Sequence, residues 1–200
     1  MQIILASGSP RRRQLLTLAG IPHEVIVSDV DETIEGTPDF QVRELALRKA
    51  NAVLSLVSPD SEAILIAADT LVYIGGEVLG KPCDSAEAFE MLKKLQGKPH
   101  KVYTGVALLN TSKQKPAHPS SEIFVDSTTV HFRQLSDAEI HAYIATGEPF
   151  DKAGAYGVQE RGAVLVDRVE GDFYTVVGLP ISKVCAALTK MGYNIWDETP

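Results

Sequence analysis

The chain has little of what staples small secreted proteins together or anchors proteins in membranes. It contains two cysteines, Cys83 and Cys185, which lie far apart and give neither a disulfide framework nor a metal-ligand spacing. No basic segment followed by a sustained apolar stretch opens the chain, and no window reaches the roughly 20 apolar residues that span a bilayer. The sequence therefore predicts a soluble, cytoplasmic protein without a membrane partner.

Excess positive charge and several catalytic motifs are also missing. The net charge is −7, so the surface as a whole repels nucleic acid, and we expect no nucleic-acid partner. The five histidines form no HxH or HExxH pattern, and neither GxSxG nor GxxxxGK[ST] occurs. These absences disfavour zinc hydrolysis, a serine triad and P-loop nucleotide chemistry.

What is present is typical of an ordinary globular protein, with 44% hydrophobic and 22% charged residues. A length of 200 residues fits a single domain over 1–200, with two lobes around a cleft as the variant we keep open. Alternating helix and strand patterns early, then hairpin-like strands, predict an α/β fold with a mixed sheet. One expected helix begins at Pro10, and the others cover Gln41–Val57, Asp84–Leu95, Ser136–Gly147 and Leu179–Met191. The expected strands are Ile3–Ala6, Glu24–Val27, Ala63–Ala68, Leu71–Ile74, Val78–Leu79, Val102–Leu109, Ile123–Phe132 and Ala163–Val169. Asn110–Ser121 is expected to be a long hairpin connection.

The first motif follows the strand Ile3–Ala6 and reads Ser7-Gly8-Ser9-Pro10-Arg11-Arg12-Arg13. Ser9 suits a helix N-cap and Pro10 the first helical position. A helix N-terminus attracts anions, and arginines there suit a phosphate that neutralises them. A solvated basic turn is the alternative.

A second candidate is the acid Asp69, which with Thr70 follows the apolar run 63–68. Ligands of open α/β sheets bind beyond the carboxyl ends of strands, so Asp69 is well placed for function. Lys81, in Gly80-Lys81-Pro82, lies within reach of Asp69 if the intervening hairpin closes. The alternatives are an acid that closes a loop and a lysine on a solvent-facing turn.

Carboxylates also gather after the short strand near residue 25, at Asp29, Asp31 and Glu32. Carboxylates beside arginines are typical of a divalent-metal and phosphate arrangement. For Asp29 and Asp31 an acidic loop is the favoured interpretation. Lys49 falls on the apolar stripe of its helix, which indicates an anionic partner, with snorkelling to the surface as the competing account.

Small residues surround one tyrosine and one glutamine in Asp151–Gln159. The pattern indicates backbone close to a planar ligand, with Gln159 reading the donor and acceptor edge of a base. A ligand-free glycine-rich connection is equally compatible. The segment Gly171–Pro180 is a second candidate turn, placed before the final helix.

Taken in order, these motifs resemble the Maf family of nucleotide pyrophosphatases, whose older label is septum formation inhibitor. The resemblance runs nearly end to end and rests on Ser7–Arg12, Ala68–Thr70, Gly80–Pro82, Lys152–Gln159 and Val177–Pro180. It implies a Maf/ITPase-like α/β fold built on a long mixed sheet with a central cleft, often dimeric. It also implies cleavage of nucleoside triphosphates to monophosphate and pyrophosphate with Mg²⁺ or Mn²⁺.

The motif Asp-Lys-Ala-Gly-Ala-Tyr-Gly-x-Gln resembles that of the family branch that acts on dTTP and UTP. Modified pyrimidine nucleotides stay open as further substrates. The resemblance implies that Asp69 is the catalytic acid and that Glu32 and Asp69 bind the metal. It implies that the phosphates are bound by Ser7, Ser9, Arg12, Lys49 and Lys81. It implies that substrate preference depends on Arg11, Thr70 and Gln159. The competing hypothesis is a non-catalytic nucleotide-binding regulator of septum formation. The paired acids Asp69 and Glu32 argue against it, because a pure triphosphate binder gains nothing from them unless a metal intervenes.

Overall fold

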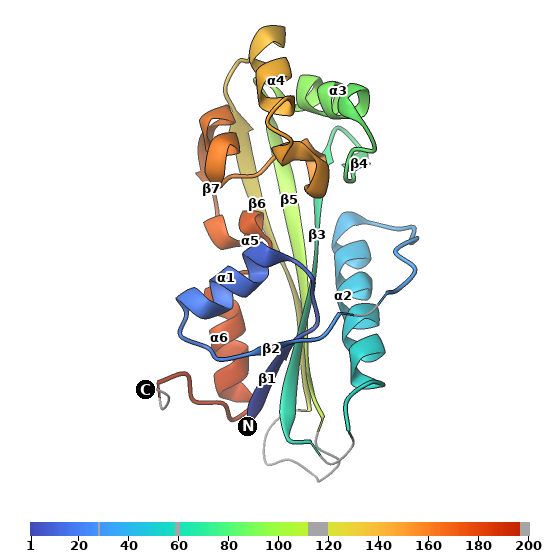
Figure 1. The fold of residues 1–200 in the computed structure, drawn as a ribbon, viewed down its shortest axis with the longest axis vertical. Coiled ribbons are helices and arrows are strands. Elements are labelled where there is room, and N and C mark those ends of the chain that lie inside the picture. The colour runs from blue at the N-terminus through green and yellow to red at the C-terminus, as the bar shows by residue number, and fades with distance from the viewer. Residues whose placement is uncertain (28, 59–60, 112–119, 197–200) are drawn as a thin grey trace. The chain divides into compact units, whose positions relative to one another are not determined.

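The computed structural model describes residues 1–27, 29–58, 61–111 and 120–196. The strands form one seven-stranded mixed sheet in the order β2-β1-β3-β5-β6-β7, with β4 paired to β3 (Figure 1). This confirms the expected α/β class. The chain divides into two compact units, one of Met1–Asp69, Thr104–Asp126 and Gly178–Pro200 and the other of Thr70–Tyr103 and Ser127–Val177. Within the described ranges, no helix is both long and apolar enough to cross a membrane.

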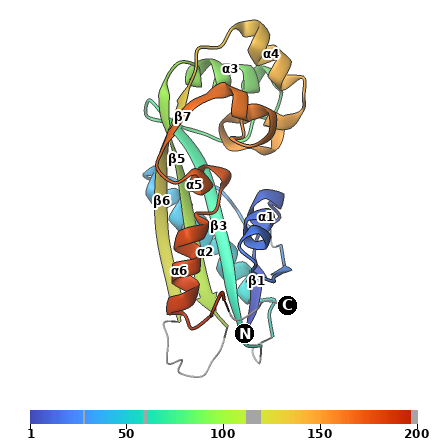
Figure 2. The same cartoon turned by 90° about the vertical axis from the view of Figure 1, so that its left-hand side faces the viewer.

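The first unit is built around parallel pairing of its N-terminal strand. Strand β1 (Gln2–Leu5) pairs in parallel with β2 (Glu24–Val25) and with the first residues of β3 (Ala63–Ile74), in a register that sets Leu5 opposite Ile66. The helices α2 (Pro38–Leu54) and α6 (Ile181–Lys190) lie on opposite faces of these strands (Figure 2). Apolar side chains of α2 bury against alternate residues of β1, β3 and β5 (Pro99–Asn110), as the period of two in a strand requires.

Close packing fixes α2 against β5 at a glycine. A Cβ atom added to Gly105 would collide with the backbone at Val42 and Arg43. Only glycine therefore lets the helix approach this strand so closely. Lys49 lies on the same helix, so this contact also sets where its side chain begins.

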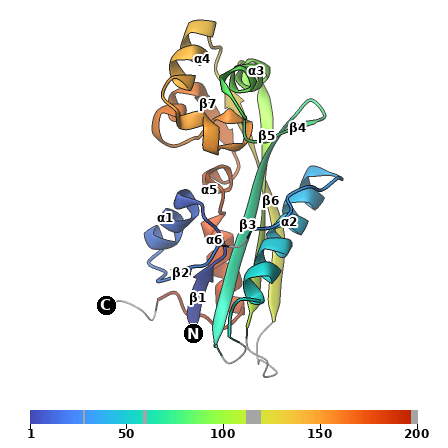
Figure 3. The ribbon, with the colours of Figure 1, turned by 45° about the vertical axis from the view of Figure 1, so that its right-hand side comes forward.

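The second unit contains the antiparallel β3–β4 pairing around the Gly75-Gly76 turn, as expected. Its helices begin at the predicted caps: Asp84 accepts from the backbone N–H of Glu87, and Ser136 forms a capping box with Glu139. Figure 3 shows the elements of this unit: β4 (Glu77–Leu79), α3 (Ser85–Leu95), α4 (Asp137–Ile144), the 3₁₀ turns η1 (Glu148–Asp151), η2 (Ala153–Ala155) and η3 (Glu160–Leu165), β7 (Val166–Glu170) and α5 (Phe173–Val177), with the outer parts of β3, β5 and β6 (Ser121–Phe132).

One boundary prediction is wrong in a way that affects the site. Asp69 was expected beyond the end of a strand, but β3 continues through it to Ile74. The ladder does not stop there because β4 pairs with Val72–Ile74. Asp69 nevertheless lies past Ile66, the last residue of β3 that pairs with β1, so the parallel ladder with β1 does end before it.

Other boundaries shift for local reasons. Helix α2 begins at Pro38, one turn before the expected Gln41, because proline suits the first helical position. Strand β7 begins at Val166 because the preceding residues form η3, and the Gly171–Pro180 segment contains the short helix α5. The Asn110–Ser121 connection joins β5 to β6, and its residues 112–119 lie outside the described residues.

Candidate active site

A lysine between two carboxylates forms the centre of the site in the first unit. Lys49 Nζ donates to Asp69 Oδ1 at 2.6 Å and lies 2.7 Å from Glu32 Oε1. The side chains of Lys49 and Asp69 are only 16% and 13% exposed, whereas Glu32 is 57% exposed. The predicted anionic partner of Lys49 is therefore confirmed. A partly buried cation joins an acid from β3 to an acid from the loop before α2.

The N-terminus of α1 (Pro10–Leu18) supplies a second cation. Ser9 caps the helix through the backbone N–H of Arg12, as predicted. The Arg12 side chain donates from Nε to the Gly178 carbonyl at 2.8 Å and from Nη1 to Ser7 Oγ at 3.0 Å. These bonds hold the guanidinium in place, so a freely solvated basic turn does not describe Arg12.

The charges around Arg12 belong to the same cluster. Burial lowers the pKa of Arg12 below its ordinary value, and Arg11 acts in the same direction. Asp69 and Glu32 raise that pKa in opposition. The first unit therefore brings Arg11, Arg12, Glu32, Lys49 and Asp69 into one electrostatic neighbourhood, with both signs of charge represented.

The acidic loop divides as expected. Asp31 Oδ1 accepts from the backbone N–H of Thr33 at 2.8 Å, a local turn that lowers the pKa of Asp31. Asp29 is exposed, whereas Glu32 reaches Lys49. The loop interpretation therefore holds for Asp31, and Glu32 is the carboxylate of this loop that joins the site.

The paired acids have the chemistry of a divalent-cation site. Mg²⁺ and Mn²⁺ prefer oxygen ligands, and Glu32 and Asp69 converge on one point that the Lys49 ammonium now shares. No group of three or more His, Cys, Asp or Glu side chains arranged to hold a metal occurs among the described residues. The donor set fits a cation that keeps several waters or takes phosphate oxygens, as Mg²⁺ does.

The remaining predicted residues belong to the second unit. Thr70 follows Asp69 in β3, and Lys81 is exposed after β4. The backbone N–H of Gly154 donates to the Gly80 carbonyl at 2.9 Å, which joins the Gly-Lys-Pro motif to the Lys152–Gln159 segment. The closeness of Lys81 to Asp69 stays a prediction.

Internal packing explains most of the small-residue segment. A Cβ atom at Gly154, whose φ is +69°, would lie 2.9 Å from the Val72 side chain, so glycine at this position allows close packing on β3. Tyr156 is buried with its hydroxyl 2.7 Å from His100 Nε2. The close contacts at these two positions are therefore with other parts of the chain, and a planar ligand beside the Asp151–Gln159 segment stays a prediction. Gln159 is half-buried, and its side chain makes no hydrogen bond within the described part of the chain.

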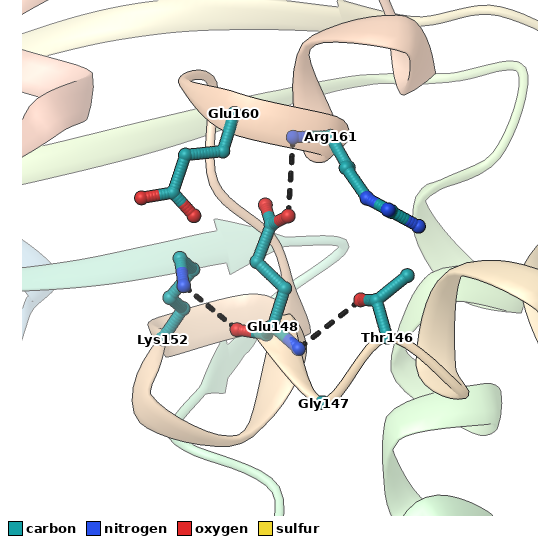
Figure 4. Close-up of a pocket in the computed structure, with 6 residues that line it drawn as sticks. All are labelled: Thr146, Gly147, Glu148, Lys152, Glu160 and Arg161. Carbon is teal, nitrogen blue, oxygen red and sulfur yellow. Dashed lines mark hydrogen bonds between the residues drawn. The ribbon is translucent and has the colours of Figure 1, made fainter.

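Sequence reasoning missed Glu148, a carboxylate that binds the backbone two residues after Gln159. Glu148 lines a pocket of 640 Å³ within the second unit together with Thr146, Gly147, Lys152, Glu160 and Arg161 (Figure 4). The only local signal was an acid directly after Gly147, near which the sequence predicts that a helix ends. No spacing rule connects it with Arg161, thirteen residues later, to which it binds.

The chain is similar in sequence to a known protein family. The family model described as Maf-like protein matches residues 2–191. Proteins of Bacillus cereus and Bacillus anthracis, both named dTTP/UTP pyrophosphatase, are 47% identical over 196 residues, covering 97% of this chain and 97% of theirs. Among solved structures, a nucleoside-triphosphatase / dITP/XTP pyrophosphatase of Mycobacterium abscessus is 11% identical with a TM-score of 0.41, covering 96% of this chain and 95% of its own. The Ham1 protein of Staphylococcus aureus is 16% identical with a TM-score of 0.44, covering 83% and 80%. Because the family model and these bacillary relatives cover nearly the whole chain, the protein belongs to the Maf family.

Proposed function

We propose that the protein is a nucleoside triphosphate pyrophosphatase that hydrolyses dTTP and UTP to the monophosphate and pyrophosphate. The bacillary relatives with that name support the substrate class. The observation that carries the proposal is the cluster in which Asp69 and Glu32 meet at Lys49, in the same electrostatic neighbourhood as Arg12.

The basic groups of the cluster are suited to hold a triphosphate. Arg12 presents a planar fork fixed by Gly178 and Ser7, and Ser9 sets the N-terminus of α1 beside it. Lys49 and Lys81 would add ammonium charges along the phosphates, where negative charge accumulates as pyrophosphate leaves. These side chains offset the repulsion that the two carboxylates would otherwise exert on the substrate.

The acids of the cluster are suited to activate water. Asp69 would accept a proton as a water oxygen forms a bond to the α-phosphorus and the bond to the leaving pyrophosphate oxygen breaks. Glu32 and Asp69 would hold Mg²⁺ or Mn²⁺, a Lewis acid that neutralises charge on the triphosphate. The Lys49 ammonium contacts both acids, so the two carboxylates face the same part of the site.

Base preference is assigned to Arg11, Thr70 and Gln159. Uracil and thymine present a carbonyl acceptor next to an N–H donor, and a glutamine amide offers one donor group and one acceptor. Gln159 has these groups available, because no hydrogen bond within the described residues occupies them. An amide held at a fixed place limits the size of the base that it can contact.

The deciding experiment measures pyrophosphate release from a panel of nucleoside triphosphates with Mg²⁺ or Mn²⁺, beside the Asp69→Asn variant. Turnover of dTTP and UTP that disappears in the variant supports the enzyme and its acid together. Metal-independent binding without turnover by the folded protein would instead favour the nucleotide-binding regulator of septum formation. We also propose that the protein forms a homodimer, which light scattering of the purified protein checks, and that it acts in the cytoplasm, which fractionation of cells checks.

A further inference from the structure

The Glu148 carboxylate joins segments of the second unit that are distant in sequence. Its Oε1 accepts from the Tyr143 hydroxyl at 2.9 Å and from the backbone N–H of Gly162 at 3.0 Å. Its Oε2 accepts from the backbone N–H of Arg161 at 3.1 Å (Figure 4). A charged acceptor makes stronger hydrogen bonds than a neutral one, so a single side chain holds the start of η3 to the end of α4.

The preceding turn is held to the same point. The backbone N–H of Gly157 donates to the Tyr143 hydroxyl at 3.3 Å, so this hydroxyl accepts from Gly157 while it donates to Glu148. A Cβ atom at Gly162 would collide with the Gly157 carbonyl oxygen, so the two glycines lie against each other. Residues 157–162 therefore form a loop closed at both ends, which we call the Gln159 loop.

Gln159 lies in the middle of this loop and depends on its backbone for position. Its side chain has no hydrogen bond to any described residue. The next residue, Glu160, has a φ of +55°, a conformation that a non-glycine residue adopts only when its surroundings impose it. The bonds from Glu148 and Tyr143 hold both ends of the loop in which Gln159 and Glu160 lie.

We propose that Glu148 is a positioning residue that sets base selectivity by holding the Gln159 loop, without touching the substrate. The inference rests on the proposed function, because it takes Gln159 as the group that reads the base. It deepens that function by placing control of selectivity in a carboxylate outside the phosphate site. Loss of the loop contacts would let the Gln159 amide shift and admit larger or differently edged bases.

The variant that tests this is Glu148→Gln, which preserves the size of the side chain. Its amide oxygen can replace Oε1, but its NH₂ group would face the Arg161 N–H, donor against donor. We expect the ratio of kcat/KM for dTTP to that for dGTP to fall about tenfold, with kcat for dTTP within about a factor of two. Gln159→Ala should lower the same ratio, and adding Glu148→Gln to it should lower the ratio no further.

Glu139→Gln is the matched control, because Glu139 is another structural carboxylate of the same unit. It accepts from the Ser136 N–H and hydroxyl, each at 2.8 Å, pairs with Arg133, and makes no hydrogen bond to the Gln159 loop among the described residues. The control should lower the melting temperature and leave the ratio unchanged. If Glu148→Gln does not fold, Tyr143→Phe removes the hydroxyl between Glu148 and Gly157 and should lower the ratio in the same direction.

The outcomes separate the two proposals. If Gln159→Ala lowers the ratio but Glu148→Gln and Tyr143→Phe reduce turnover of every triphosphate equally, Glu148 has only a structural role and this inference is overturned while the proposed function stands. If the ratio survives Gln159→Ala, the base-reading role of Gln159 fails and this inference fails with it. A folded wild type that hydrolyses no triphosphate overturns the proposed function itself.

Discussion

The two units bury titratable groups in opposite ways. The first unit shelters charges: Lys49 and Asp69 are mostly buried and paired, and Arg12 keeps Asp69 and Glu32 near it. In the second unit, burial raises the pKa of Tyr156 and lowers the pKa of His100 to about 4, so both groups are neutral at pH 7.

The difference indicates a division of labour. Sheltered charge is costly unless it is paired, and here the pairing brings both signs to the place proposed for a triphosphate and a cation. In the second unit the Glu148 carboxylate instead works with a buried neutral hydroxyl and backbone N–H groups to hold the Gln159 loop in shape, which is what reading a base requires. The few charged groups sheltered in the second unit, such as Lys152, bind their own surroundings: Lys152 donates to the Glu148 carbonyl and to Asp151.

Removing the Asp69 carboxylate from the charged cluster should have the largest effect on turnover. Asp69→Asn keeps the shape of the side chain and leaves Glu32 to pair with Lys49, so the fold should persist. A lost general base reduces turnover by about a thousandfold. Pyrophosphate release from dTTP measures it. The exposed Asp29 supplies the control, and an Asp29→Asn variant as impaired as Asp69→Asn would contradict the assignment.

Removing the cation between the acids should have the next largest effect. Lys49→Met keeps the length of the side chain but leaves Asp69 and Glu32 without their common partner, so the two acids repel each other and the phosphates. We expect kcat/KM for dTTP to fall about a hundredfold. Lys93→Met, which removes a surface lysine that pairs with Asp137 in the second unit, should leave kcat/KM unchanged. Equal losses in both variants would sink the assigned role of Lys49.

The neutral core of the second unit should respond to acid. His100 is 3% exposed, and burial lowers its pKa from 6.5 to about 4 in the folded state. The unfolded chain therefore binds more protons between these values, and stability is lost as the pH falls through this window. Urea unfolding at pH 7 and pH 5 should show a loss of about 2 kcal/mol from this group.

His100→Gln separates this contribution from the titration of carboxylates. An amide can still bond to the Tyr156 hydroxyl, but it takes up no proton in this range. The variant should be less stable at pH 7 and should lose less stability between pH 7 and pH 5. An undiminished pH dependence in the variant would assign the acid sensitivity to other groups.

Local sequence patterns predicted the features that depend on neighbours in the chain. The cap at Ser9, the capping box at Ser136 and the inward position of Lys49 all follow from spacing within one helix, and all are confirmed. The residue types suggested that carboxylates such as Glu32 lie beside the arginines, but the grouping of Arg12 with Asp69 came only through the family resemblance. Nothing in the local sequence brings α1 to β3, because strand pairing over sixty residues does so.

Features that depend on distant partners were missed or misplaced. Asp69 lies within β3 and not after it, because the pairing with β4 that extends the strand is made beyond it. Gly154 packs against Val72 on a strand eighty residues earlier, a contact that no local pattern predicted. Glu148 carried no recognisable signal, since its partners Arg161 and Gly162 become adjacent only in the fold.

The smallest effect is expected for the change Gln159→Ala in the second unit, which should alter base selectivity and little else. Gln159 has no hydrogen bond to lose within the described residues, so Gln159→Ala should change the free energy of unfolding by less than about 0.5 kcal/mol. The charged cluster remains whole, so phosphate binding should persist, whereas preference for dTTP over other triphosphates should fall about tenfold as one polar contact to the base disappears. Competition between dTTP and dGTP in a single reaction measures that preference directly. A uniform loss over all triphosphates would place Gln159 with the phosphate-binding groups and remove the distinction between the two units.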